Sequence, residues 1–351
     1  MGVAVIKTAE FKPDFKRLDA VLKGKSCDVV PLFEYFADPE IIETVTGKKY
    51  SPEAIVEFYY SMGYDYVHVP LNLDYDIRKK TTSDTAVLSR GERSFVDISH
   101  GVIESREDFD SYDWPAVDIF VAKNVLDIVK FLPDNVKIML DITPGGVYEI
   151  LVWVMGYNAL SEAMFEDEQL VLDVIKKASE SIIKSMELCI QAADGRIGAI
   201  AYGDDLGFNT GTMLSPAFLR KHIFPEYKLH ADLAHRFDLP FIFHSCGKID
   251  AIMPDLIDYV GIDAKHSFQH GTSDVFDAKS KYGDKITLLG GVDMHKLCTL
   301  EECELRAYVR EIFHACASER FAIGSGNSIA NYVPIQQYMI MVDECNRLRF
   351  C

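Results

Sequence analysis

The stretch LPFIFHSCG at residues 239–247 joins an apolar run to a short polar segment. The apolar run is typical of a buried β-strand, and His244 and Cys246 follow where the strand gives way to a loop. Because side chains i and i+2 of a strand point to the same face, both can enter one site. Imidazole with thiolate is a donor pair that zinc favours. The structural alternative is a neutral core histidine beside an inert buried thiol.

Similar apolar, β-rich runs recur along the chain, with helical segments between most of them. The runs cover residues 29–35, 64–71, 136–142, 197–206, 240–246, 260–267, 286–292 and 320–327. Eight strands that alternate with helices predict an α/β fold of the (β/α)8 TIM-barrel type, and an open doubly wound sheet is the alternative. We expect one barrel domain over residues 1–351, with an N-terminal extension before the first strand.

Three helical features and one insertion are also predicted. Apolar residues at helical spacing predict a long helix over 161–193. Ser215 before Pro216 is a good N-cap for a helix that reaches residue 223. Thr299 with Glu302 resembles a capping box for a helix through residue 317. The long gap after the second strand, residues 72–135, predicts an inserted hairpin and helix.

Composition limits the choice of partner. The 351-residue chain carries a formal net charge of −18, which disfavours nucleic acid and anionic membrane surfaces as partners. Its eight cysteines include no Cys-x-x-Cys pair, so a reduced, cytoplasmic protein is expected. No apolar run reaches membrane-spanning length. The Rossmann glycine fingerprint and the Gly-x-Ser-x-Gly elbow are both absent, which disfavours nicotinamide dehydrogenases and α/β-hydrolases.

Polar residues gather at the predicted strand ends, where barrel enzymes build their active sites. Asp204 and Asp205 close the fourth strand, and because adjacent strand residues face opposite sides, one can face the barrel axis while the other supports the loop. His266 on the sixth strand is a metal ligand, a substrate partner or a solvated histidine. Asp293 reads as a helix N-cap. The candidate catalytic residues are Asp204, Asp205 and His266.

Several short segments follow one another along the chain: 17–22 with 28–32, 155–157, 214–216 with 224–225, 243–247, 289–293 and 324–329 with Pro334. In this order they resemble the uroporphyrinogen decarboxylase superfamily over nearly the whole chain, and its corrinoid-dependent methyltransferase branch in particular. The resemblance implies a (β/α)8 barrel. It also implies a zinc site made by a His-x-Cys pair and a distant cysteine, in which His244 and Cys246 match the first two ligands.

The third ligand departs from that pattern, since the sequence places Asn327 where the family cysteine falls. Asparagine is a poor zinc ligand. Either a carboxylate at the rim, such as Asp205 or Glu34, replaces it, or zinc binding is weak or absent. The arginine-rich stretch that binds the acidic side chains of the porphyrin in the decarboxylases is also missing, because residues 32–38 hold no arginine.

The resemblance therefore implies a methyltransferase that moves a methyl group between a small methylated substrate and the cobalt of a separate corrinoid protein. A methoxyaromatic ether is favoured, and a methyl thiol is the other substrate class. A carboxy-lyase and a non-catalytic, corrinoid-protein-binding barrel are the alternatives. The base-off cobalamin signature Asp-x-His-x-x-Gly does not occur, so the cobamide is expected on the partner. A homodimer is left open. The candidate substrate-binding residues are Glu34, Tyr148, Tyr202, Phe208, Asn209 and Asn327.

Overall fold

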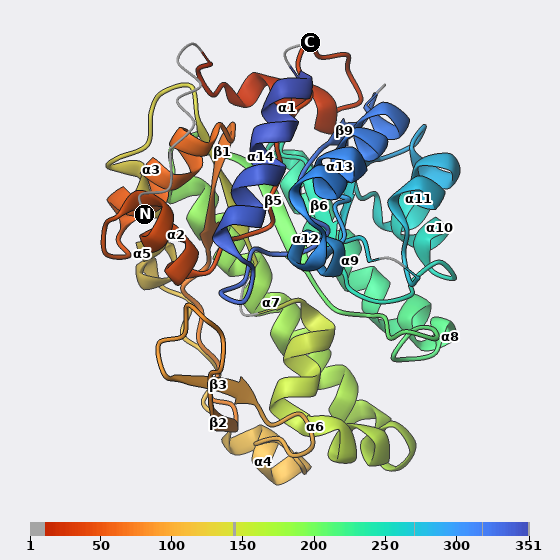
Figure 1. Cartoon of the computed structure of the whole chain (residues 1–351). Coiled ribbons are helices and arrows are strands. Elements are labelled where there is room, and N and C mark those ends of the chain that lie inside the picture. The colour runs from red at the N-terminus through yellow and green to blue at the C-terminus, as the bar shows by residue number, and fades with distance from the viewer. Residues whose placement is uncertain (1–10, 143–144, 270, 318, 350–351) are drawn as a thin grey trace.

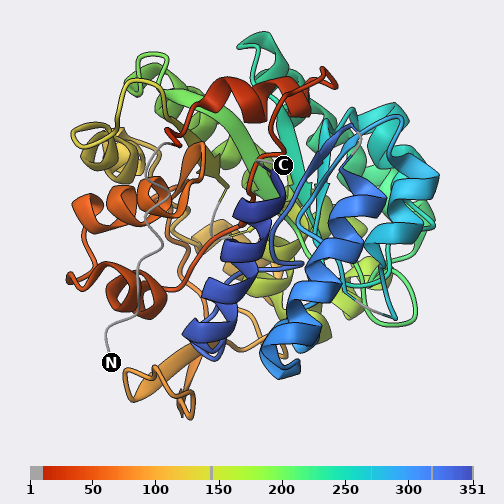
Figure 2. The same cartoon turned by 45° about the horizontal axis from the view of Figure 1, so that its top comes forward.

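A curled parallel sheet forms the centre of the computed structural model, which describes residues 11–142, 145–269, 271–317 and 319–349. Its seven strands follow one another in the order β1-β4-β5-β6-β7-β8-β9. Helices pack around the outside of the sheet (Figures 1 and 2). The predicted α/β barrel class is thus confirmed. The strands are β1 (Tyr66–Pro70), β4 (Lys137–Asp141), β5 (Ile197–Gly203), β6 (Phe241–His244), β7 (Ala264–His266), β8 (Thr287–Leu289) and β9 (Phe321–Ala322).

The first predicted strand, at 29–35, forms only a short backbone contact between residues 31–33 and Ile323, which is the seam of the barrel. Leu32 makes a single parallel bridge to Ile323, just beyond β9. The Phe33 N–H donates to the Ile323 carbonyl at 2.9 Å. Towards β1 the contact passes through a side chain, because the Tyr66 hydroxyl accepts from the Glu34 N–H at 2.7 Å. The segment therefore joins the two edges of the sheet through one backbone bridge and one side-chain contact, a pairing too short to form a regular strand.

The helical layer agrees with the sequence in part. The predicted helix over 161–193 is two helices, because the Asp167 side chain accepts from the Leu170 N–H at 3.0 Å and starts a new one. The layer comprises α1 (Phe15–Leu22), α2 (Pro39–Thr46), α3 (Pro52–Met62), α5 (Lys123–Val129), α6 (Val147–Glu166), α7 (Glu168–Ala192), α8 (Pro216–Phe218), α9 (Phe224–Arg236), α10 (Met253–Asp255), α11 (Val275–Tyr282), α12 (Met294–Thr299), α13 (Glu302–Cys316) and α14 (Ile335–Arg349). It also contains the short 3-10 helix η1 (Ile119–Ala122) and the short π-helices η2 (Leu219–Ile223) and η3 (Leu256–Val260). In the described part of the chain, no helix combines the length and apolarity needed to cross a membrane.

Two of the three predicted helix starts are confirmed. Ser215 caps α8, its hydroxyl accepting from the Phe218 N–H at 3.2 Å. Asp293 caps α12 through the Lys296 N–H at 3.0 Å. The capping box at Thr299 is wrong. Thr299 is the last residue of α12, and its hydroxyl donates to the carbonyl four residues back instead of capping α13.

The insertion after β1 contains the predicted hairpin and helix. They are β2 (Lys79–Ser83), β3 (Glu92–Val96) and α4 (Arg106–Ser111). The insertion is hydrogen-bonded to α6 at the point where Gly156, with a non-helical φ of 71°, interrupts that helix. Around the break, the Tyr157 N–H donates to the Ile98 carbonyl at 2.8 Å and the Val102 N–H to the Val154 carbonyl at 2.7 Å. The hairpin, α4 and α6 consequently project together from the end of the barrel opposite α1 (Figure 1).

Candidate functional site

The carboxyl ends of three neighbouring strands bring the His-x-Cys segment together with a carboxylate. In the sheet register, His244 at the end of β6 lies between Gly203 of β5 and His266 of β7. Asp205 follows β5 by two residues, and Cys246 follows β6 by two. Residues that are distant in sequence thus meet at one rim, where a barrel places its chemistry.

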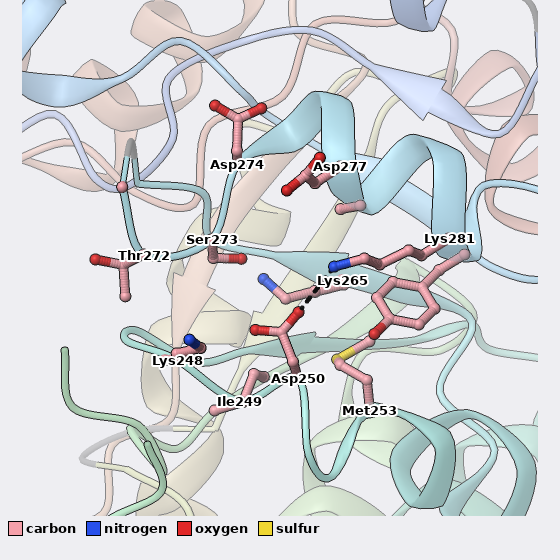
Figure 3. A pocket seen from close by; sticks show the side chains of 13 residues that line it. Lys248, Ile249, Asp250, Met253, Lys265, Thr272, Ser273, Asp274, Asp277 and Lys281 are labelled. Atoms are coloured by element: carbon pink, nitrogen blue, oxygen red, sulfur yellow. Dashed lines mark hydrogen bonds and ion pairs between the residues drawn. The ribbon is translucent and has the colours of Figure 1, made fainter. Parts of the chain in front are cut away.

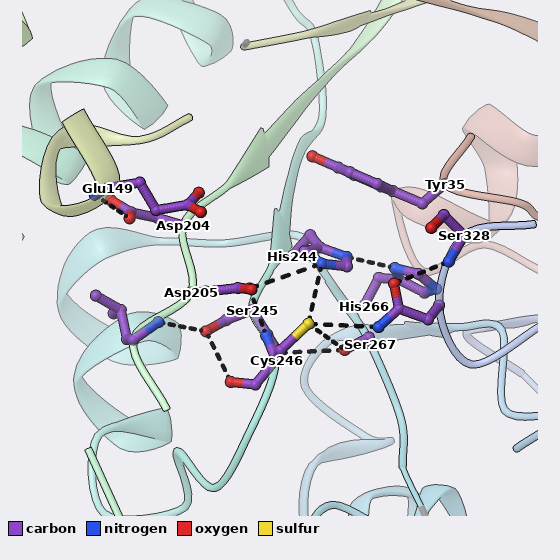
Figure 4. Close-up of polar contacts among 12 residues, drawn as sticks. Tyr35, Glu149, Asp204, Asp205, His244, Ser245, Cys246, His266, Ser267 and Ser328 are labelled. Carbon is purple, nitrogen blue, oxygen red and sulfur yellow. Dashed lines mark hydrogen bonds and ion pairs between the residues drawn. The ribbon is translucent and has the colours of Figure 1, made fainter. Parts of the chain in front are cut away.

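Asp205, His244 and Cys246 form a group able to hold a metal ion, with all three donor atoms within 4.8 Å of one another (Figure 4). The Nε2 atom of His244 lies 3.6 Å from Cys246 Sγ and 3.8 Å from Asp205 Oδ1. Bond lengths of about 2.0–2.3 Å separate the ligands of tetrahedral zinc by roughly 3.5 Å, so the spacing fits zinc. The Cys246 N–H donates to Asp205 Oδ1 at 2.8 Å and thereby holds the carboxylate in place.

Asn327 lies against the sulfur of this group. Its Nδ2 donates to Cys246 Sγ at 3.3 Å, and its Oδ1 accepts from the Ser328 N–H at 2.9 Å. The side-chain oxygen of Asn327 is therefore hydrogen-bonded to the backbone and does not face the Cys246 sulfur. Burial, followed by the charge of Asp205, raises the pKa of the Cys246 thiol to about 12. Without a cation the thiol is protonated, whereas a bound zinc ion would deprotonate it.

Glu34 is buried away from the metal-binding group. Its Oε1 accepts from the Ser325 N–H at 3.0 Å, and its Oε2 accepts from the Ser325 hydroxyl. Burial raises the pKa of Glu34 to about 8, although the Ser325 bonds oppose the rise. The carboxyl group thus fixes the loop after β9, and of the two carboxylate candidates for the third ligand only Asp205 lies among the donor atoms of the described residues.

Asp204 and Asp205 point in different directions. Asp204 is fully buried and accepts from the Tyr148 and Glu149 N–H groups, each at 2.8 Å, and from the Tyr227 hydroxyl at 2.5 Å. It therefore supports the start of α6. Burial raises the pKa of Asp204 to about 7. The structure thus places Asp205 at the metal-binding group and Asp204 behind it.

The other candidate substrate-binding residues are dispersed. The Tyr148 hydroxyl pairs with that of Tyr157 at 3.1 Å, and the buried Tyr202 hydroxyl accepts from the Val147 N–H at 3.0 Å. Both hydroxyls are therefore used in holding α6. Phe208 and Asn209 are exposed on the loop after β5. Only Asn327 of the predicted substrate-binding set touches a residue of the metal-binding group.

Two residues without a predicted role lie at the site. Tyr35 stacks on the His244 ring at 4.2 Å between centroids, and its hydroxyl donates to Asp141 Oδ1 at 2.7 Å. Glu149 faces Asp204 and Asp205 (Figure 4). Burial, with the charges of Asp204, Asp205 and Asp141, raises the pKa of Glu149 well above its ordinary value. The sequence could have indicated Glu149, because it lies in the first turn of the helix that follows the Gly145-Gly146 loop at the rim.

A cavity of about 480 Å³ adjoins the metal-binding group through Asn327. Three apolar or aromatic side chains line it, and it also contains several polar groups. The lining residues are Phe268, Gln269, Asp293, Met294, His295, Cys298, Asn327 and Tyr332. Asp205, His244 and Cys246 do not line this cavity, and Asn327 is the residue that contacts both the cavity and the Cys246 sulfur. The volume admits a small organic molecule next to Asn327.

A second cavity, of about 470 Å³, lies beside β7 between the loops that lead to α10 and α11 (Figure 3). Lys265 reaches it from the sheet. The ammonium group is buried, donates to the Ser267 carbonyl at 2.5 Å and lies 4.3 Å from the centre of the Phe268 ring. Burial lowers the pKa of Lys265 to about 8. This cavity does not include Asp205, His244 or Cys246.

The buried ammonium predicts a pH effect on stability. Between a folded pKa of about 8 and the ordinary 10.5, the unfolded chain binds a proton that the folded chain lacks, so stability rises with pH in that window. Relative to Lys265→Met, wild type should gain about 2 kcal/mol of unfolding free energy between pH 7 and pH 9.5, at roughly 1.4 kcal/mol per pKa unit. Urea unfolding at both pH values measures this. Relative to the control Lys285→Met, which replaces an exposed lysine, wild type should show no such gain. An equal pH response in the two variants would contradict the prediction.

Known proteins place the chain in a family. The model of the uroporphyrinogen decarboxylase (URO-D) family matches residues 91–348. No curated protein matches the sequence. A solved methyltransferase from Methanosarcina mazei is similar in structure, with a TM-score of 0.72 and 16% identity over 97% of this chain and 99% of that one. A putative vitamin-B12-independent methionine synthase from Listeria monocytogenes has a TM-score of 0.52 and 12% identity over 91% and 98% of the two chains. These structures share the fold, and the family match, which spans well over half of the sequence, shows that the chain belongs to the uroporphyrinogen decarboxylase family.

Proposed function

We propose that this protein is a zinc-assisted, corrinoid-dependent methyltransferase that takes a methyl group from a small methylated substrate to the cobalt of a separate corrinoid protein. The observation that carries the proposal is the group formed by Asp205, His244 and Cys246 at the carboxyl rim of a URO-D-family barrel. Its three donors are the nitrogen, sulfur and oxygen atoms that zinc binds, at separations that suit one ion. Three protein ligands leave a fourth position for substrate.

The ligand set favours an oxygen-bearing substrate. Asp205, His244 and Cys246 would hold the zinc, and a bound zinc ion supplies Lewis-acid stabilisation to a leaving oxygen or a thiolate. Where the family pattern has a second cysteine thiolate, this site has the Asp205 carboxylate. The carboxylate carries the same charge as the thiolate but is a hard donor instead of a soft one. Less electron density then reaches the metal, which strengthens the pull on an ether oxygen. The set supports O-demethylation over transfer from a thioether.

The adjoining cavity supports an aromatic substrate. Phe268, Met294 and Tyr332 offer apolar contact area, and Asn327 connects the cavity with the Cys246 sulfur. A methoxybenzene could pack its ring on these side chains and direct its ether oxygen towards the rim. The volume of about 480 Å³ leaves room for polar ring substituents.

Carboxylates at the rim disfavour the carboxy-lyase alternative. Asp141, Glu149, Asp204 and Asp205 are close enough for the charges of the other three to raise the pKa of Glu149. A tetrapyrrole with many carboxylates would meet these carboxyl side chains, and residues 32–38 hold no arginine to pair with it. A neutral methyl ether carries no charge to be repelled.

Methyl transfer from substrate to free cobalamin tests the proposal. Zinc-loaded protein is mixed with chemically reduced cobalamin and a panel of methoxybenzenes and methyl thioethers, and methylcobalamin is followed by absorbance. We expect product from at least one methoxybenzene, none with Cys246→Ser, and an unchanged rate with Cys303→Ser, an exposed cysteine on α13. Absence of methylcobalamin with every substrate would refute the proposal. Methyl transfer to a thiol without cobalamin would instead indicate a corrinoid-independent enzyme.

A further inference from the structure

Two buried histidines share one hydrogen bond beside the metal-binding group. His244 Nδ1 and His266 Nδ1 lie 2.7 Å apart (Figure 4). Both side chains are buried, with relative exposures of 7% and 0%. A bond between two ring nitrogens holds one hydrogen, so one ring donates and the other accepts. The direction of the bond decides which nitrogen of His244 is left with a free lone pair.

The outer partner of His266 fixes that direction. His266 Nε2 lies 3.3 Å from the carbonyl oxygen of Ser325, which can only accept. In a neutral ring, a hydrogen on Nε2 leaves Nδ1 with a lone pair, so His266 Nδ1 accepts from His244 Nδ1. His244 Nε2 is then unprotonated. That is the atom 3.6 Å from Cys246 Sγ and 3.8 Å from Asp205 Oδ1.

The surroundings hold this arrangement in place. Glu34 binds both the N–H and the hydroxyl of Ser325, which orients the Ser325 carbonyl. Gly290, with a φ of +93°, allows the approach, since a Cβ there would lie 2.2 Å from the Ser325 oxygen and 3.2 Å from His266 Nε2. The Tyr35 ring stacks on His244 at 4.2 Å and on His266 at 5.5 Å. Neither imidazole is free to turn over.

We propose that His266 is a positioning residue that locks His244 in its Nδ1–H tautomer and thereby presents the Nε2 lone pair to the metal. The role in zinc binding rests on the proposed function, whereas the tautomer is a property of the protein alone. The Ser325 carbonyl and the buried Glu34 carboxyl group complete the chain of contacts behind the ligand. Partners of this kind fix the tautomer and raise the basicity of metal-binding histidines.

The tautomer is measured first, without metal. Two-bond ¹H–¹⁵N correlation spectra of the metal-free protein at pH 8 distinguish protonated from unprotonated ring nitrogens, and a His244→Gln sample assigns the signals. We expect Nδ1–H with bare Nε2 for His244, and Nε2–H with bare Nδ1 for His266. A hydrogen on His244 Nε2 would overturn the inference, whatever the protein does with zinc.

Zinc affinity is measured second, by competition with a chromophoric chelator. His266→Phe keeps a ring against Tyr35 and removes the acceptor, and should weaken zinc binding roughly 10- to 100-fold. His266→Asn places an oxygen near the position of Nδ1 and should recover part of that loss. The control His230→Phe replaces an equally buried histidine, bonded to Ser179 on α7, and should leave affinity unchanged.

The outcomes separate the two claims. Equal affinity in wild type and in folded His266→Phe would overturn the positioning role. Failure of wild type to bind zinc, together with the expected tautomers, would instead remove the proposed function and leave the tautomer assignment intact. Circular dichroism of each variant establishes that it is folded.

Discussion

Replacement of Cys246 by serine is expected to weaken zinc binding by about 100- to 1,000-fold. Zinc binding by four-ligand structural sites is worth about 10–16 kcal/mol, or about 2.5–4 kcal/mol for each ligand, and every 1.4 kcal/mol is tenfold in affinity. Cys246 is the one sulfur among the three donors, and Asn327 and Ser267 both direct polar hydrogens at it. Chelator competition on the purified variant measures the loss.

The matched control for this prediction is Cys303→Ser. Cys303 is an exposed cysteine on α13, outside the metal-binding group. Its replacement should leave zinc affinity within twofold of wild type. If Cys246→Ser and Cys303→Ser bound zinc with equal affinity, the metal would be held elsewhere, and the assignment of His244 and Asp205 as ligands would fall with that of Cys246.

Replacement of Gly324 by alanine is expected to cost about 2–4 kcal/mol of unfolding free energy or to prevent folding, because overpacking against rigid backbone cannot relax locally. A Cβ at Gly324 would lie 1.7 Å from the Phe33 carbonyl oxygen. That carbonyl belongs to the seam where residues 31–33 pair with Ile323 to close the barrel. Urea unfolding followed by circular dichroism measures the shift in midpoint.

Gly211→Ala is the control for the seam. A Cβ at Gly211 meets nothing within 4 Å. Its midpoint should stay close to that of wild type, since substitutions without new contacts cost little. A wild-type midpoint for Gly324→Ala would show that the segment at residues 31–33 is displaced at no cost, and the closed barrel would lose its support.

The sequence predicted the seven strands of the sheet, including β1, which lies at the edge of the sheet and pairs with β4 alone. The run at 239–243 is β6, between β5 and β7, and it ends at His244 as expected. The run at 29–35 has the same apolar character, but its backbone pairing is a single bridge between Leu32 and Ile323. Composition reports burial, and it does not report over how many residues a buried segment pairs with its neighbour. Thr299 was mispredicted for a different reason, because its hydroxyl bonds within α12 and the N-cap position of α13 falls at Glu301.

The site was predictable to the extent that it is local. His244 and Cys246 share a face because they are two residues apart. Asp205 joins them through the pairing of β5 with β6, and the sequence could name it as one replacement for the missing cysteine without choosing it over Glu34. The stacking of Tyr35 on His244 depends on the barrel seam, which joins segments more than 200 residues apart in the chain. Contacts of that range leave no periodicity in the sequence.

One thiolate, one imidazole and one carboxylate are expected to hold zinc at this rim. X-ray absorption at the zinc edge of the zinc-loaded protein measures this ligand set. We expect a single sulfur at about 2.3 Å, with the other ligands being nitrogen or oxygen at about 2.0–2.2 Å, and loss of the sulfur shell in Cys246→Ser. A shell of two or more sulfurs, or one with no sulfur, would contradict it.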